Sequence, residues 1–234
     1  VALFKKYPDT YRMPVYPTHR TVRLPDDVLT KVRQNGMTAE LVNDGNGAIN
    51  FEVAHAFPIP QNGLEAIWNH IVRYRTDSAR RTIGQAPITR DGNYTMVMFT
   101  DEYLGAYGLA GATEEALDNI IVYFKQTVTA PARLAGEVLL VHETLNQARE
   151  NRKAWLYNPG QRRVRRAPNV AFDFPRTASD GSATSDQFDM YNGAPDRYDW
   201  KLVGRKEMYV PYNSYKLQDP SVKFKEILTP LHIN

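Results

Sequence analysis

The sequence predicts an α+β protein in which a few helices pack against an antiparallel sheet. Three observations indicate this class. Segments rich in β-branched and aromatic residues recur between Gly, Pro, Asn and Asp, at the spacing of consecutive antiparallel strands. Only a few stretches have the apolar spacing or the capping residues of helices. Finally, 42% of the 234 residues are hydrophobic and 24% are charged, which is typical of a chain with a folded core.

The N-terminal part, residues 1–35, is predicted to be an extended and helical lead-in. It contains YPDTYRMPVYP, and prolines at this density disfavour regular structure. A short helix is expected over residues 26–34, ending at Asn35-Gly36. The turn signal DGNG at residues 44–47 then leads into a strand or extended segment over residues 48–60.

A second helix is predicted near residues 63–74. Asn62 is a favourable N-cap, and Glu65 stands three residues later, where its side chain can reach back to the cap. Apolar residues follow at the spacing of one helix face: Leu64, Ile67, Trp68 and Ile71. We expect this helix to cover one face of the sheet.

The rest of the chain, residues 36–234, is predicted to be one body dominated by strands. Strand-like segments lie at 94–104, 119–130, 136–145, 153–159 and 161–167. A short helix is expected near 113–118. The polar stretch 177–198 is expected to be a long loop with a helical turn at 185–191, and a last strand pair is predicted over 199–212.

The stretch WLYNPGQRRVRRAPN, residues 155–169, predicts a hairpin with a basic return strand. Pro and Gly at the centre of residues 158–161 suit a type II turn. The expected cross-strand pairs are Tyr157 with Arg162, Trp155 with Val164 and Lys153 with Arg166 on one face, and Leu156 with Arg163 and Ala154 with Arg165 on the other. One interpretation is a solvated edge strand whose charges prevent aggregation.

The neighbouring strands point to a hydrophobic role. NIIVYFKQ and GEVLLVHE are apolar on both faces. A sheet of this kind must be covered on both sides or must leave one face for an apolar guest. A nucleic-acid site is not expected, because the net charge is only +3, from 29 basic and 26 acidic residues.

No enzyme active site, metal site or cofactor site is indicated. The chain has no cysteine, its five histidines lack metal-ligand spacing, and it contains no nucleophile-elbow or phosphate-loop motif. Five aspartates fit no calcium-loop spacing: Asp180, Asp186, Asp189, Asp196 and Asp199. No apolar run approaches the roughly 20 residues of a membrane span, so the chain is not expected to cross a membrane.

Several long motifs resemble a Gram-negative bacterial family, domain-of-unknown-function family thirteen-twenty-nine (DUF1329), which is similar to outer-membrane lipoprotein-sorting proteins. The motifs are YFKQTVTAPARLAGEVLLVHETLNQ, WLYNPGQRRVRRAPN and TSDQFDMYNGAPDRYDWKLVGRKE, with YPTHRT, LVNDGNG and FPIPQNGLEAIWNHIVRYR upstream. Members of the family are roughly twice this length with their leader, so we expect the chain to be a fragment of a longer member.

A looser resemblance links the chain to the LolA/LolB/RseB-like superfamily. It is carried by Trp155, Tyr157, Pro159, Arg162–Arg166 and Ser185-Asp186-Gln187-Phe188. The resemblance implies a curved, incomplete, unclosed β-barrel packed on helices, with a hydrophobic cavity for acyl chains. It also implies export to the periplasm.

Our leading hypothesis is a non-catalytic periplasmic carrier for a lipid, a lipoprotein acyl chain or another hydrophobic ligand. The residues expected to face the ligand are Trp155, Tyr157, Val122, Phe124, Leu140, Met96 and Met98. Arg162 and Arg166 are expected at the rim, facing an anionic headgroup. The resemblance implies an inner-membrane hydrophobe exporter or an outer-membrane protein as partner. The alternative is a structural or sensing module of the cell envelope that acts through protein–protein contacts.

Overall fold

The computed structural model describes residues 2–52, 54–109, 112–147, 149–167 and 170–229. Contacts divide the chain into two compact units, residues 24–203 and residues 1–23 with 204–234, whereas the sequence predicts one domain over residues 1–234. The larger unit contains the sheets and the longer helices.

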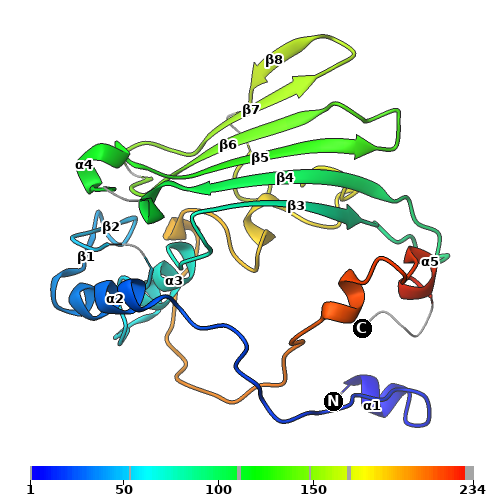
Figure 1. Ribbon diagram of the computed structural model, residues 1–234, viewed down its shortest axis with the longest axis horizontal. Coiled ribbons are helices and arrows are strands. Elements are labelled where there is room, and N and C mark those ends of the chain that lie inside the picture. The colour runs from blue at the N-terminus through cyan, green and yellow to red at the C-terminus, as the bar shows by residue number, and fades with distance from the viewer. Residues whose placement is uncertain (1, 53, 110–111, 148, 168–169, 230–234) are drawn as a thin grey trace. The chain divides into compact units, whose positions relative to one another are not determined.

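Six antiparallel strands form the main sheet, in the order β3-β4-β5-β6-β7-β8 (Figure 1). Their bounds are Ser78–Gln85, Val97–Gly105, Ile120–Ala130, Val138–Thr144, Lys153–Asn158 and Arg163–Arg166. Each strand pairs with the next along the chain, so the topology is a simple up-and-down meander. The predicted α+β class and antiparallel sheet are confirmed. The sheet is not closed into a barrel, and β3 and β8 are its edges.

Strand β3 is a structural element that the sequence analysis missed. Its sequence, SARRTIGQ, has no apolar alternation, and its first five residues are all exposed. It is held by its full backbone pairing with β4, from Ser78 opposite Leu104 to Gln85 opposite Val97. An edge strand needs one sheet neighbour and little apolar surface, which explains why hydrophobic patterning gave no signal.

Helix α2 spans Asp26–Thr38 and continues past the predicted end at Asn35-Gly36. The Asn35 side chain explains the difference. Its amide donates to the carbonyl oxygens of Glu52 and His55 at 2.6 and 3.2 Å, and its oxygen accepts from the Glu52 N–H at 2.8 Å. Asn35 is therefore a buried helical residue whose side chain joins α2 to the backbone of Glu52 and His55, whereas the sequence suggested that the helix ends there.

Helix α3 spans Gly63–Ile71 and begins as predicted, with the Asn62 side chain accepting from the Glu65 N–H at 2.9 Å. Its Trp68 is fully buried and donates to the carbonyl of Gly45 at 2.8 Å. Around Trp68 lies a core built from α3, from the small hairpin β1–β2 (Glu40–Val42 and Gly47–Ile49) and from the start of β5. These elements lie together at one end of the main sheet (Figure 1).

Short helical elements complete the fold. The predicted helix near 113–118 is α4, Glu114–Leu117, which Thr113 caps through its side chain. Three 3₁₀ helices lie in the larger unit: Ala106–Gly108, Ser185–Gln187 and Pro195–Arg197. The helical turn predicted over 185–191 is therefore limited to its first three residues, and the rest of 177–198 is mostly irregular, as expected.

The β7–β8 hairpin has the predicted faces but a different register. Tyr157 lies opposite Val164, where Arg162 was expected, and Trp155 lies opposite Arg166. The loop is longer than predicted because Asn158 accepts from the Gln161 N–H at 3.0 Å and Arg162 has a left-handed φ of 50°. A slip of two residues keeps every side chain on its predicted face, since the side-chain period of a strand is two.

The smaller unit has little regular structure. It contains α1 (Ala2–Lys6), a 3₁₀ helix (Tyr215–Gln218) and α5 (Phe224–Ile227), and Thr21 bonds the Asn213 side chain at 2.9 Å. The strand pair predicted over 199–212 is wrong, because residues 199–212 form no strand. Residues 201–212 are all exposed, so their apolar residues lack the sheet neighbour that would turn an alternating pattern into a strand.

Replacing Gly63 by Ala tests how closely the chain after the sheet packs against α3. An added Cβ would lie 2.3 Å from the carbonyl carbon of Trp200, so backbone would have to move. We expect Gly63→Ala to lower the free energy of unfolding by roughly 1–3 kcal/mol in a denaturant titration. Gly193→Ala is the control, because its nearest neighbour would be 3.6 Å away. Equal effects of the two substitutions would contradict this packing.

Candidate functional site

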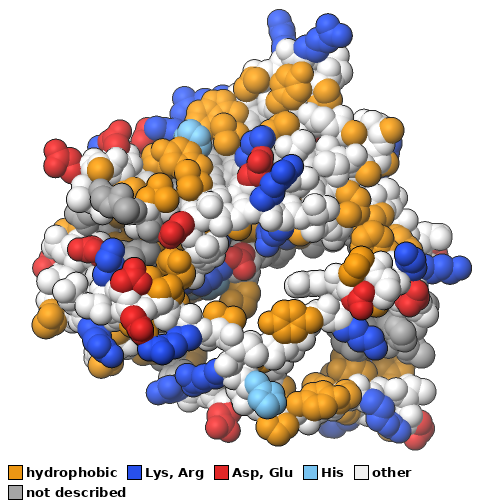
Figure 2. Space-filling view, viewed as in Figure 1, with side chains coloured by type: hydrophobic (Ala, Val, Ile, Leu, Met, Phe, Trp, Pro, Cys, Tyr) orange, Lys and Arg blue, Asp and Glu red, His pale blue; other side chains and the backbone are white. Residues whose placement is uncertain are grey.

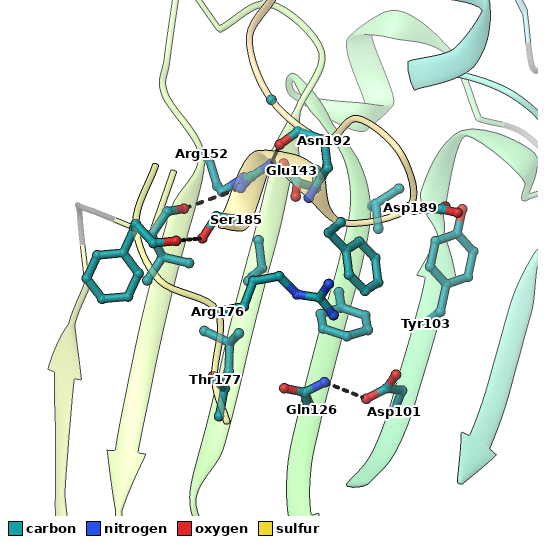
Figure 3. Close-up of a pocket in the computed structure, with 18 of the residues that line it drawn as sticks. Asp101, Tyr103, Gln126, Glu143, Arg152, Arg176, Thr177, Ser185, Asp189 and Asn192 are labelled. Carbon is teal, nitrogen blue, oxygen red and sulfur yellow. Dashed lines mark hydrogen bonds and ion pairs between the residues drawn. The ribbon is translucent and has the colours of Figure 1, made fainter. Parts of the chain in front are cut away.

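A pocket of about 340 Å³ lies on one face of the main sheet, in the larger unit. Its floor comes from alternate residues of β3 to β7, and its roof comes from residues 170–193, here called the covering segment (Figure 3). Because alternate residues of a strand face opposite sides, β5 presents Val122, Phe124 and Gln126 to the pocket. The same alternation places Tyr123 and Lys125 on the other face of the sheet, here called the outer face.

The floor is apolar in the middle and charged at both ends. Phe124 lies opposite Val141, which lies opposite Ala154, and these three form the central row. At one end Asp101 lies opposite Gln126. At the other end Val122 lies opposite Glu143. A ligand on this floor therefore meets hydrocarbon between two polar ends.

Side chains of the sheet and of α3 hold the covering segment over the floor. Gln85, at the end of β3, donates to the carbonyls of Thr177 and Ala178 at 3.1 and 2.6 Å. His70 of α3 lies 3.1 Å from the carbonyl of Tyr191. These contacts attach both halves of the segment to regular structure, which fixes the roof although its only helix is the short 3₁₀ turn Ser185–Gln187.

Arg152 makes the most buried of these attachments. Its guanidinium donates to Glu143 at 2.7 Å, to the carbonyl of Val170 at 3.3 Å and to the carbonyl of Asn192 at 3.2 Å. The Arg152 and Glu143 side chains are 5% and 16% exposed, so this ion pair lies in a poorly solvated place. A single cation thus joins β6 to both ends of the covering segment (Figure 3).

The acidic end of the floor is also internally paired. The Asp101 carboxylate is 2% exposed and accepts from Gln126 at 3.0 Å and from Arg81 at 3.1 Å. On the helix side, Asp189 pairs with Arg73 and, at 3.3 Å, with Arg75. Burial raises the pKa of Tyr103, the tyrosine that lines this side of the pocket.

The motif Ser185-Asp186-Gln187-Phe188 contributes both to the pocket and to its support. Ser185 and Phe188 line the pocket, and the Phe188 ring lies 5.8 Å from that of Phe124. Asp186 is buried and accepts from Tyr198 at 2.8 Å. Burial would raise the pKa of Asp186, but hydrogen bonds from Thr184 and Tyr198 lower it.

The structure divides the residues that the sequence suggested for ligand contact. Val122 and Phe124 line the pocket. Met96 immediately precedes β4, which begins at Val97, and is not among the lining residues. The others, Met98, Leu140, Trp155 and Tyr157, lie on the outer face, opposite residues that do not line the pocket.

The two arginines expected at the rim also lie away from the pocket. Arg166 is opposite Trp155 on the outer face, and Arg162 is in the hairpin loop. Figure 2 shows basic side chains gathered at this hairpin, next to hydrophobic ones.

Sequence reasoning missed the arginines that line the pocket: Arg75, Arg81, Arg152 and Arg176. The dense run at 162–166 drew attention instead, although its strand residues 163–166 are exposed. The sequence signal that could have pointed to this pocket is the motif at residues 185–188, because Ser185 and Phe188 line it.

A model of the family described as "Protein of unknown function (DUF1329)" matches residues 1–234. The chain belongs to this family. It is 58% identical over 234 residues to a Pseudomonas aeruginosa protein named "Uncharacterized protein PA3922". That alignment covers 100% of this chain and 51% of the relative, so the chain spans about half the length of the relative. No solved structure matches the chain.

The part of this DUF1329 chain that the structure describes contains neither a membrane-spanning helix nor a metal-binding cluster. No described helix combines the length and the apolar composition needed to cross a bilayer. Likewise, the described residues include no group of three or more His, Cys, Asp or Glu side chains placed to hold a metal ion.

Removing the Arg152 guanidinium should destabilise the protein strongly. In Arg152→Ala the carboxylate of Glu143 stays in a poorly solvated place without its cation, and two carbonyls lose a donor. We expect a loss of roughly 3 kcal/mol in the free energy of unfolding, measured by denaturant titration. Arg149→Ala is the matched control: its pair with Asp118 is exposed, 64% and 86%, and should contribute less than about 1 kcal/mol. Similar losses would show that Arg152 does not join sheet and cover.

Acidification should destabilise the folded protein through its histidines. Burial lowers the pKa of His55, His70 and His142 below 6.5, and a nearby cation adds to each shift. The unfolded chain therefore binds more protons as the pH falls through about 6.5, so the free energy of unfolding falls between about pH 7.5 and pH 5. His70→Gln should reduce this slope in denaturant titrations at several pH values. A wild-type profile that is flat over this range would contradict the assignment.

Proposed function

We propose that this DUF1329 chain binds a hydrophobic ligand in the pocket and acts as a non-catalytic carrier in periplasmic cell-envelope transport. The observation that carries the proposal is the apolar lining contributed jointly by sheet, helix and covering segment. These residues are Ile71, Ile121, Val122, Phe124, Leu139, Val141, Leu156, Val170, Phe174 and Phe188. The periplasmic location and a membrane-protein partner rest on the family resemblance.

The size and lining of the pocket support binding of one apolar chain. Its volume of about 340 Å³ is at the small end of ligand sites, which span roughly 300–1,000 Å³. Each buried CH₂ contributes about 0.8 kcal/mol, so roughly ten methylenes contribute on the order of 8 kcal/mol. That is comparable to the roughly 4–15 kcal/mol cost of immobilising a ligand.

The polar groups of the pocket support a binding role over a catalytic one. Asp101, Glu143 and Asp189 are each held by at least one arginine. The hydroxyl of Ser185 donates to the carbonyl of Phe174 at 3.1 Å, and no histidine is among the lining residues. A serine nucleophile here would lack its general base, and the carboxylates are engaged as structural ion pairs.

The outer face supports the second candidate, an envelope module that acts through protein contacts. His142 lies between the rings of Tyr123 and Trp155, with centroids 4.7 and 4.8 Å away. Tyr123 is 36% exposed and Val164 is 64% exposed. Such aromatic surface beside arginines resembles the composition of protein interfaces.

Denaturing extraction of the purified full-length protein, followed by mass spectrometry, separates the two functions. Under the first proposal the extract contains a hydrophobic molecule, and a fluorescent fatty acid binds to the stripped protein. An empty extract together with no binding would contradict the carrier function. A pull-down that recovers a protein partner without any lipid would favour the envelope module.

Two neighbouring leucines provide a sharp test of which face binds. Leu139 lines the pocket, whereas Leu140 follows it on β6 and points to the outer face. We expect Leu139→Trp to fill the pocket and to weaken fatty-acid binding at least tenfold in fluorescence titrations, which corresponds to about 1.4 kcal/mol. Leu140→Trp should leave binding unchanged. The reverse pattern would move the site to the outer face.

A further inference from the structure

The charges in the pocket do not balance. Four arginines line it, Arg75, Arg81, Arg152 and Arg176, against three acids, Asp101, Glu143 and Asp189. Three of the arginines pair with one acid each: Arg75 with Asp189, Arg81 with Asp101 and Arg152 with Glu143. Among the residues that the structure describes, Arg176 has no carboxylate within ion-pair distance. The pocket thus contains one cation in excess.

The backbone of the covering segment holds Arg176 in place. Its N–H donates to the carbonyl of Ala183 at 3.0 Å, and its carbonyl accepts from the backbone and the hydroxyl of Ser179 at 3.2 and 2.9 Å. Ser179 is 2% exposed, so this small loop is packed at its base. Gln85 holds the next residue, Thr177, to the end of β3. The backbone from which the Arg176 side chain extends is therefore fixed by the fold.

The Arg176 side chain lies over the apolar part of the pocket. Its guanidinium is 5.2 Å from the centroid of the Phe188 ring, and Phe188 in turn lies against Phe124. In Figure 3 the side chain extends from the covering segment toward the middle of the pocket. The N–H donors of a guanidinium lie in its plane, so an arginine that stacks on an aromatic ring can still donate to an anion at its edge.

We propose that the pocket takes a single-chain amphiphile with an anionic head, and that Arg176 binds the head. The proposal rests on the carrier function above and defines its ligand class. Carboxylate and phosphate share the required chemistry, two or more acceptor oxygens that match the guanidinium fork. The apolar chain then lies along the row of Phe124 and Val141. The volume of about 340 Å³ favours one chain over a lipid with several.

The wild-type protein alone can test the ligand class. Titrations of the delipidated full-length protein with dodecanoate, dodecyl phosphate and dodecanol compare three heads on one chain length. We expect at least one anionic ligand to bind about tenfold or more tightly than the alcohol. The reason is that hydrogen bonds between the Arg176 guanidinium and a charged head are stronger than those to a neutral hydroxyl. The comparison of the two anions distinguishes a carboxylate from a phosphate ligand. Equal affinity for all three would overturn this inference and leave the carrier function standing, whereas no binding of any would overturn both.

Substitutions of Arg176 test whether this residue binds the anionic head. Arg176→Gln should abolish the head preference, so that the variant binds the anionic ligand no more tightly than it binds dodecanol. Arg176→Lys should recover part of the preference, because it restores the charge without the fork. Arg166→Gln is the control, since Arg166 lies on the outer face opposite Trp155. Thermal melts establish that each variant is folded. A head preference that survives in folded Arg176→Gln, or that is lost in Arg166→Gln, would contradict the assignment.

Discussion

The pocket depends on one buried ion pair, that between Arg152 and Glu143. A guanidinium stays charged at any pH that proteins tolerate, so it can be buried only with acceptors around it. Here those acceptors are one carboxylate from the sheet and two carbonyls from opposite ends of the covering segment. The segment satisfies much of its own backbone through turns, and side chains of the regular elements bind further carbonyls and so attach it to the sheet and to α3. The hydrogen bonds that compensate the buried charge of Arg152 are therefore the same ones that hold the covering segment over the sheet.

This arrangement explains why a largely apolar pocket carries so many charges. Each acid on the floor is engaged by an arginine, and these pairs lie at the ends of the sheet face, leaving hydrocarbon between them. Arg176 differs because the covering segment supplies it without an acid. An apolar floor with one unneutralised cation above it is complementary to an amphiphile, since the chain is desolvated while its head is paired.

The main strands and the cap of α3 could be predicted because they depend on nearby residues. Runs such as NIIVYFKQ have the composition of a strand, and Asn62 followed by Glu65 forms a local capping interaction. Nearby residues gave the wrong prediction at Asn35, because its side chain hydrogen-bonds to a segment some twenty residues away. They gave no prediction of β3, because backbone pairing with β4 holds this strand in the sheet. Residues 177–198, which include most of the covering segment, were expected to be a loop, but no periodicity indicates which surface a loop will cover.

By itself, the sequence determined that β5 to β7 carry two faces, and it assigned each residue to a face through the strand period of two. Only the tertiary structure decided which face became the pocket: the covering segment lies over Val122 and Phe124 and leaves Trp155 and Leu140 outside. The physical reason is that both faces are apolar enough to be covered, so hydrophobicity cannot choose between them. The choice is made by specific polar contacts, from Gln85, Arg152 and His70 to backbone carbonyls far along the chain, which leave no pattern in the sequence.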